Sequence, residues 1–339
     1  MPIWTFPKQR SSENSSIHVD NLSRSEIIAF QVVLSILSFI GTFGNLFTIL
    51  ALLKSSTLRK KSTTKFVVSL ATSDLFYCTF TMPCNVWTNN NEFELTIAIC
   101  PYYGIVKYAP LIVSVVTLTA IAINRYVIVC HNAMYENVCS NHKVGLNIAL
   151  IWFIGFGLLT LPVFELWGKF GLIETQLNPS VMSLLQCDII PKDNQSPKVF
   201  YFALFTVLPL VIMIFCYTMI FLKIRRVKKQ LRELNLKGNR EDWDILKMMF
   251  TLFICHIVCM VPIAIMNIID PSKQKLHWFL IPYLIYTCQA IINPFVYGYK
   301  NSTYRPAFIE LYQQIRFCLQ FDTFKLTQKS ETGETHITK

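Results

Sequence analysis

Seven long apolar runs divide this chain, and they constrain its fold more than any other feature. Each run has roughly the 20 residues that an α-helix needs to cross about 30 Å of hydrocarbon. The predicted helices cover residues 27–53, 64–88, 97–130, 144–165, 199–226, 243–269 and 277–299. A hydrophobic share of 53% and a charged share of 15% also fit a chain surrounded mostly by lipid. The sequence therefore predicts an all-α membrane protein, a bundle of seven transmembrane helices.

The positions of Lys and Arg predict how this bundle lies in the membrane. Cytoplasmic loops retain positive charge, and an extracellular N-terminus places about 22 of the 31 basic residues on the cytoplasmic side. Most of these lie in two clusters, 54–65 and 223–247. We therefore interpret the net charge of +11 as a signal of topology and not of nucleic-acid binding. We expect a multi-pass protein of the plasma membrane with its N-terminus outside.

Most of the 11 cysteines lie inside apolar runs, where Cys acts as a small buried hydrophobe. Cys100 and Cys187 differ, because they fall at the outer start of the third run and in the second outer loop. In that oxidising compartment we expect them to form a disulfide. Cys318 follows an amphipathic stretch and is either a lipidation site or a free thiol. Asn14 and Asn21 begin glycosylation sequons in the outer tail.

Marker residues recur in order along the predicted helices. They are Gly44-Asn45, Leu70 to Asp74, Cys100 with Asn124-Arg125-Tyr126, Trp152, Pro209 with Tyr217, Cys259 to Pro262, and Asn293 to Tyr297. Over residues 25–320 the sequence resembles the rhodopsin-like G-protein-coupled receptors. Asn124 in place of the usual Asp, and Tyr304 to Phe308 after the last helix, are similar to the branch of melatonin, Moody and Trapped-in-endoderm receptors.

The resemblance implies a receptor that binds an extracellular ligand, activates a heterotrimeric G protein and associates with arrestin, without being an enzyme. We expect an extracellular tail over 1–26, a seven-transmembrane receptor domain over 27–299 and a disordered cytoplasmic tail over 319–339. Between them, residues 300–318 are expected to form a short amphipathic helix on the inner leaflet. Its side chains expected to face membrane lipids are Phe308, Leu311, Tyr312 and Ile315.

A second set of expectations concerns the activation switch. Arg125 follows Cys100 by 25 residues, about 37 Å of helix, and therefore lies at the cytoplasmic end. In the family such an Arg is held by an acid at the base of the sixth helix, and Asp242 is the matching residue. Alternatively, Arg125 faces inner-leaflet water. Because Asn124 is neutral, a neighbouring carboxylate is missing, and raised basal signalling is expected. Alternatively, Glu241 or Glu233 is the partner of Arg125 in addition to or in place of Asp242.

Further switch residues come from the third, fifth, sixth and seventh helices. The resemblance assigns this role to Tyr126, Tyr217, Met260, Pro262, Asn293, Pro294 and Tyr297. Pro294 allows its helix to kink, so that Tyr297 can move toward Tyr217. Met260 stands where the family has Trp, and His256 where it has Phe, so rotamer switching by a Trp is not expected.

Asp74 lies midway along the second run, where the resemblance implies a sodium pocket with Ser114 and Asn293. Carboxylate, hydroxyl and amide oxygens suit a hard cation, and a buried carboxylate needs a partner. The alternative is a polar network filled by water. No other cofactor is expected.

Lys107 is the main indication of the ligand. It lies 7 residues, about 10 Å, below the outer end of the third helix. A cation here disfavours a monoamine and favours an acidic headgroup, such as that of a fatty acid or lysophospholipid. An internal salt bridge to Glu165, Asp188 or Glu94 is the alternative.

Four tyrosines are further candidates for this ligand site, because their rings could line an apolar cavity. They are Tyr108, Tyr201, Tyr283 and Tyr286. Tyrosines also anchor helices at the membrane interface, which is the simpler interpretation of the same residues.

Other functions remain as alternatives. One is a constitutively active or orphan-type receptor with no small-molecule agonist, and another is a membrane transporter or channel, although no inverted repeat is visible. An opsin is excluded because residues 277–299 contain no Lys for retinal. The sequence contains neither His-Glu-x-x-His nor Gly-x-Ser-x-Gly, which disfavours an intramembrane enzyme.

Overall fold

The computed structural model describes residues 23–88, 99–131, 133, 140–178, 182–192, 197–233, 240–269 and 276–333. Within them, the side chains of 87–88, 141, 172–178, 182–186, 231–232, 240–246, 276–277, 319 and 321–333 are not described. The main helices are α1 (Arg24–Lys54), α3 (Ser62–Phe76), α4 (Met82–Thr88), α5 (Cys100–Cys130), α7 (Asn141–Gly157), α10 (Leu208–Glu233), α11 (Arg240–Ile269), α12 (Leu276–Lys300) and α13 (Arg305–Gly333). Shorter elements are α2 (Ser56–Arg59), α8 (Thr160–Val163), α9 (Lys198–Phe202) and two π-helical segments, η1 (Tyr77–Thr81) and η3 (Ala203–Val207).

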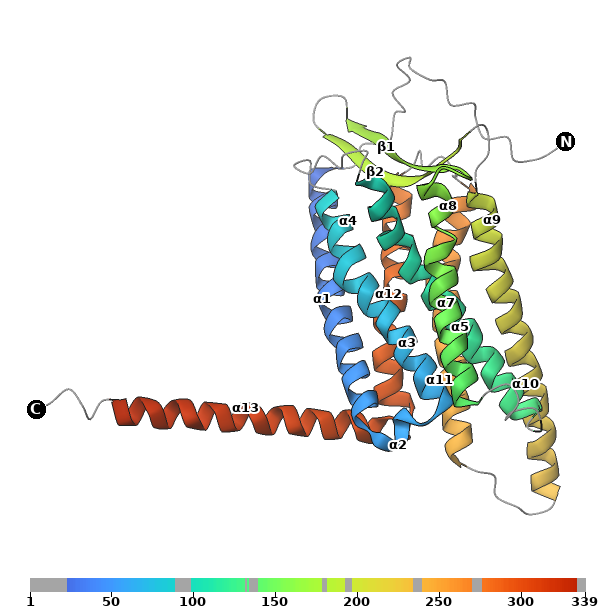
Figure 1. Ribbon diagram of the computed structural model, residues 1–339, viewed down its shortest axis with the longest axis vertical. Helices are drawn as coiled ribbons and strands as arrows, with labels where there is room; N and C mark the ends of the chain where they lie inside the picture. Colours follow the sequence, from blue (N-terminus) through green and yellow to red (C-terminus); the bar gives the residue numbers. More distant parts are fainter. Residues whose placement is uncertain are drawn as a thin grey trace, which may run out of the picture.

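The long helices lie side by side in one bundle, with α13 leaving it at a steep angle (Figure 1). Among the described residues, six helices are long and apolar enough to cross a membrane. The remaining segment of the bundle is α3, η1 and α4, an unbroken helical run over 62–88. The predicted seven-helix bundle is therefore confirmed.

Local sequence explains where the helices begin and where they deviate. Ser23 caps α1, since its Oγ accepts the N–H of Glu26 while the Glu26 carboxylate accepts the N–H of Ser23. Both π-helical segments end two residues before a proline, Pro83 or Pro209. A proline lacks the N–H that an α-helical turn requires, so the backbone adjusts in the preceding turn.

Polar side chains tie the helices together inside the apolar bundle. Nδ2 of Asn45 in α1 donates to the Ala290 carbonyl of α12 at 2.9 Å. Nε1 of Trp152 in α7 donates to Oγ of Ser69 in α3 at 3.0 Å. Because lipid gives helices little hydrophobic reason to associate, such bonds and close packing hold the bundle together.

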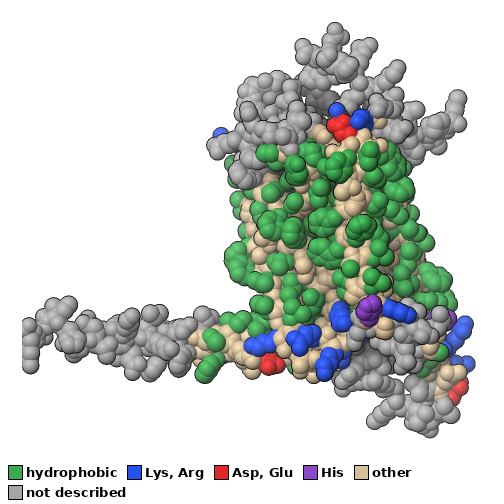
Figure 2. All heavy atoms as spheres, in the orientation of Figure 1, with side chains coloured by type: hydrophobic (Ala, Val, Ile, Leu, Met, Phe, Trp, Pro, Cys, Tyr) green, Lys and Arg blue, Asp and Glu red, His purple; other side chains and the backbone are tan. Residues whose placement is uncertain are grey.

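One element departs from a purely helical fold. A hairpin of two antiparallel strands, β1 (Lys169–Asn178) and β2 (Met182–Ile190), covers one end of the bundle (Figure 1). We name this end the hairpin end and the opposite one the α13 end. Hydrophobic side chains cover the middle of the face in Figure 2, whereas many Lys and Arg side chains gather at the α13 end.

Helix α13 is longer than the expected juxtamembrane helix. It continues to Gly333, past the boundary predicted at 318, over a stretch without an internal Gly and with a single Pro in its first turn. Leu311 is buried, so the prediction that it faces lipid is wrong. Phe308 is half-buried and packs against Phe47 of α1. Tyr312 and Ile315 are exposed as expected.

Candidate functional site

At the hairpin end, a disulfide joins the second strand to the start of α5. Cys100 and Cys187 are bonded, which confirms the predicted pair. The hairpin also packs directly on α5, since a Cβ built on Gly104 would lie 2.3–2.8 Å from ring atoms of Phe170. Only glycine permits so close an approach at this position. These two contacts fix β2 over the outer turns of α5.

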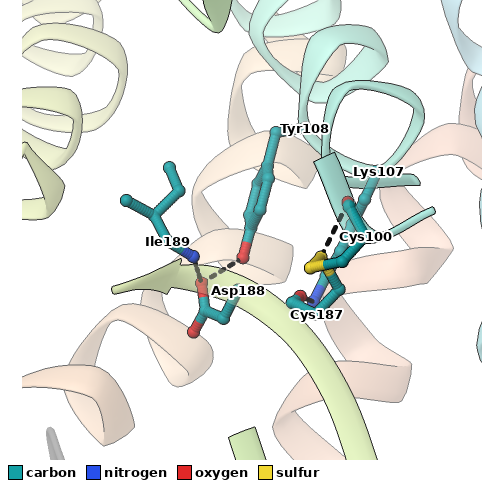
Figure 3. Close-up of a disulfide and its surroundings, with 6 residues drawn as sticks. All are labelled: Cys100, Lys107, Tyr108, Cys187, Asp188 and Ile189. Atoms are coloured by element: carbon teal, nitrogen blue, oxygen red, sulfur yellow. Dashed lines mark hydrogen bonds between the residues drawn. A yellow bond between two sulfur atoms is a disulfide. The ribbon is translucent and has the colours of Figure 1, made fainter. Parts of the chain in front are cut away.

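The residue after Cys187 carries the carboxylate of this region. Asp188 is 6% exposed and accepts hydrogen bonds from the Tyr108 hydroxyl at 2.7 Å and the Ile189 N–H at 2.8 Å (Figure 3). Nζ of Lys198 lies 3.0 Å from its second oxygen. An almost buried carboxylate is stable here because charge-assisted bonds replace its hydration.

Lys107 extends from α5 toward Cys187 of the hairpin (Figure 3). Its Nζ donates to the Cys187 carbonyl at 3.2 Å and lies 5.2 Å from the centre of the Tyr108 ring. Tyr108 therefore contacts both charged groups, Lys107 through its ring and Asp188 through its hydroxyl. The described residues here bring together two ammonium groups, Lys107 and Lys198, and the carboxylate of Asp188.

The acids predicted as alternative partners of Lys107 have contacts of their own. Glu165 forms a 2.8 Å ion pair with Lys192, and the hydrogen bond and charge of that ammonium lower the pKa of Glu165. Asp188 contacts Lys198, a partner that the sequence did not indicate. Glu94 lies outside the described residues.

The other predicted ligand-site tyrosines divide between two networks. Tyr283 of α12 accepts a 2.7 Å bond from Nδ2 of Asn85, whose Oδ1 accepts the Tyr103 hydroxyl at 2.6 Å. Tyr286 is partly buried one turn away on α12. Tyr201 lies in α9, where its hydroxyl donates to the Leu158 carbonyl at 2.7 Å. Tyr201 thus joins two helices near the hairpin end, with its hydroxyl used by the backbone.

Midway through the bundle, Asp74 lies in a polar cluster. It is 2% exposed, its Oδ1 accepts the Ser114 hydroxyl at 2.9 Å and its Oδ2 accepts Nδ2 of Asn293 at 2.6 Å. The three residues that were predicted to form one site therefore lie together. Oδ1 of Asn45 is buried without a hydrogen-bond partner among the described residues.

At the α13 end, Arg125 is 8% exposed and turned into the bundle. Its Nη2 donates a 2.6 Å hydrogen bond to Oγ1 of Thr63 in α3. Nδ2 of Asn124 lies 3.5 Å from the same oxygen. Tyr126 turns elsewhere and contacts Nε2 of His131 at 3.0 Å. Asp242 belongs to α11, but its side chain is not described, so its predicted contact with Arg125 stays a prediction.

The remaining predicted switch residues lie in the core of the bundle, away from the hairpin. Tyr217 of α10 stacks on Phe253 of α11 with ring centres 4.8 Å apart. Tyr297 is fully buried and meets the Tyr304 ring edge-on, and its hydroxyl has no partner among the described residues. Pro262 lies inside α11 and Pro294 inside α12, and both helices continue past these residues. Met260 and His256 are both buried.

The modification sites are not tested by the structure. Cys318 is an exposed free thiol on α13, which is compatible with either predicted state. Asn14 and Asn21 lie outside the described residues.

The seven-helix bundle, its disulfide-linked hairpin and its buried arginine define a multi-pass membrane protein of the receptor class. Residues 44–297 match the family described as 7 transmembrane receptor (rhodopsin family). The chain belongs to this family, the rhodopsin-like G-protein-coupled receptors, and is therefore a receptor and not an enzyme. The transporter or channel alternative and the agonist-free alternative receive no support from these findings.

Three curated relatives illustrate the similarity. Protein trapped in endoderm-1 of Drosophila melanogaster is 29% identical over 82% of this chain and 76% of its own length. The mouse (Mus musculus) melatonin receptor type 1B is 29% identical over 86% and 80%. G-protein coupled receptor moody of Drosophila melanogaster is 23% identical over 86% and 52%, so the chain spans about half of that relative's length. The resemblance predicted from the marker residues is confirmed.

Proposed function

We propose that this receptor lies in the plasma membrane with its hairpin end outside, binds an extracellular ligand with an acidic group, and activates a heterotrimeric G protein through its α13 end. Membrane lipids and arrestin are further proposed partners at that end. The concentration of Lys and Arg there supports this orientation, because cytoplasmic surfaces retain positive charge. The proposed glycosylation at Asn14 and Asn21 requires the same orientation.

The observation that supports an acidic ligand is the placement of Lys107. Its ammonium is anchored by a neutral carbonyl, that of Cys187, next to the aromatic face of Tyr108. Lys198 and Asp188 form an ion pair beside this ammonium. A carboxylate or phosphate headgroup would gain charge-assisted hydrogen bonds here, whereas an amine would be repelled.

Lys107→Gln is expected to remove the response to an acidic ligand and leave the rest of the receptor intact. The test measures GTPγS binding to G protein in membranes of expressing cells, with a panel of fatty acids and lysophospholipids. Loss of a charge-assisted hydrogen bond is expected to raise the half-maximal concentration about tenfold or more.

The matched control is Lys192→Gln, which makes the same charge change at a partly exposed ion pair with Glu165. It is expected to respond like the wild type. If an acidic lipid activates wild type and Lys107→Gln with equal potency, the anionic-ligand proposal is wrong and Lys107 has a structural role only.

We also propose that Asp74, Ser114 and Asn293 hold a sodium ion. The donor set fits, because the buried Asp74 carboxylate and the Ser114 hydroxyl are hard oxygen ligands that already touch, with Asn293 on the second carboxylate oxygen. When bound, sodium would neutralise the Asp74 carboxylate, and Ser114 and Asn293 would keep that carboxylate oriented.

Replacing NaCl by choline chloride is expected to lower the thermal midpoint of the purified wild-type receptor. Occupancy at a concentration several times the dissociation constant contributes about 1 kcal/mol, a shift of about 2 to 4 °C for a chain of this size. Asp74→Asn should lose this sodium dependence. Ser38→Ala, which removes another buried hydroxyl that bonds the Cys78 carbonyl, should keep it. An Asp74→Asn receptor that still responds to sodium would exclude this site.

A further inference from the structure

At the α13 end, Arg125 has an acceptor that its own motif does not indicate. Thr63 is the second residue of α3, and its Oγ1 receives the 2.6 Å hydrogen bond from Nη2 of Arg125. Nδ2 of Asn124 lies 3.5 Å from the same oxygen, at the long limit of a hydrogen bond. All three side chains are buried. Two neighbouring side chains of α5 thus converge on one uncharged oxygen of another helix.

We infer that Thr63 is a positioning residue that holds Arg125 inside the bundle and so restrains the receptor in its signalling-inactive state. This inference rests on the proposed coupling of the receptor to a G protein. Asn124 contributes an amide where a carboxylate would offer negative charge, so the Thr63 hydroxyl supplies acceptor capacity in its place. A hydrogen bond from a charged donor is stronger than one between neutral groups, which makes a hydroxyl sufficient for a moderate restraint.

The burial of Arg125 indicates which state the contact stabilises. With 8% exposure the guanidinium is withheld from the surface that a G protein would meet. Presenting Arg125 to a partner at the α13 end requires the bond to Thr63 to break. The contact therefore acts only on the buried state, and removing it shifts the population toward the exposed one.

Thr63→Val tests the inference because it removes the hydroxyl and keeps a branched side chain of similar size. Ligand-free GTPγS exchange on G protein is expected to rise about fivefold to tenfold, the effect of losing one hydrogen bond to a charged group. Thr63→Ser restores a hydroxyl and should return exchange to near the wild-type rate. Adding Arg125→Ala to Thr63→Val should abolish the increase.

The matched control is Thr119→Val. Thr119 is another buried threonine, and its hydroxyl donates at 2.9 Å to the Val115 carbonyl of its own helix. A change confined to helix α5 should leave ligand-free exchange unchanged. All rates are divided by the number of receptors at the cell surface, and Thr63→Ala takes the place of Thr63→Val if the latter does not reach the surface.

A second readout needs no G protein and separates failure of the inference from failure of the coupling proposal. A bimane fluorophore is attached to the thiol introduced by Lys247→Cys, at an exposed position of α11, in receptor that also carries Cys318→Ser. Receptor with Cys318→Ser alone, treated with the same reagent, gives the background. Thr63→Val should shift the emission toward that of a more solvated probe, and Thr63→Ser should not. That shift without nucleotide exchange would support the restraint and contradict the coupling proposal. If the wild type promotes exchange but Thr63→Val changes neither the exchange rate nor the bimane emission, the inference about Thr63 is wrong and the coupling proposal stands.

Discussion

Receptor carrying Arg125→Ala is expected to promote nucleotide exchange at less than about a tenth of the wild-type rate, at an unchanged surface level. The guanidinium is the charged donor of α5 at the α13 end, and we propose that it reaches the G protein once it leaves Thr63. Losing one charge-assisted hydrogen bond costs about 1.5 to 3 kcal/mol, which corresponds to at least about tenfold in rate. GTPγS exchange with purified receptor and G protein measures the effect.

Arg59→Ala provides the comparison for this prediction. Arg59 ends the short helix α2 at the same end of the bundle, and its side chain is exposed. Removing an exposed charge is expected to change the exchange rate about twofold at most, since water screens its interactions. Equal rates for wild type and Arg125→Ala would exclude Arg125 from coupling and leave it as a structural contact of Thr63.

Arg125→Ala is expected to lower the nucleotide-exchange rate, whereas Thr63→Val is expected to raise it. These opposite directions distinguish a restraint from a packing contact. If both residues only stabilised the packing of α3 on α5, removing either side of their bond would have effects in the same direction. A restraint on an active group predicts higher basal exchange without Thr63 and none without Arg125. If the double variant has the low exchange rate of Arg125→Ala, the effect of Thr63 requires Arg125.

The sequence was sufficient to predict the bundle, because each apolar run must satisfy its own backbone hydrogen bonds in lipid and only a helix does so. The family resemblance predicted that Asp74, Ser114 and Asn293 lie together, and such polar groups inside apolar helices do need partners. The position of Arg125 at one end followed from its distance along the helix to Cys100. These features depend on local pattern and on helix length.

The contacts that the sequence missed depend on which surfaces meet. Thr63 is one of many threonines at helix ends, and nothing in its neighbours shows that it faces Arg125. Lys198 contacts Asp188 only because β2 folds over the bundle, and that placement depends on the packing of Phe170 on Gly104. The contact of Phe308 in α13 with Phe47 in α1 likewise joins helices that are far apart in the sequence.

Loss of the disulfide is the other change with a large expected effect. Cys187→Ser should greatly reduce the amount of folded receptor at the surface, because the bond holds β2 and Asp188 over α5. The bonded residues are 87 positions apart, and chain entropy alone gives about 4 to 5 kcal/mol for a loop of this length. That value is an upper one, since inserted helices already restrict the unfolded chain. Surface labelling and the thermal midpoint in detergent measure the loss.

The pair also predicts a pattern among the variants. Cys100→Ser, Cys187→Ser and the double variant should be impaired to the same extent, because each removes the same bond and effects within one bond are not additive. Cys84→Ser, which alters a partly buried free cysteine of α4, should behave like the wild type.

A receptor with Cys187→Ser that matches the wild type in surface level and thermal midpoint would show that packing of Phe170 on Gly104 holds the hairpin without the covalent link. In that case Lys107 and Asp188 would keep their positions, and the response to an acidic ligand should survive as well.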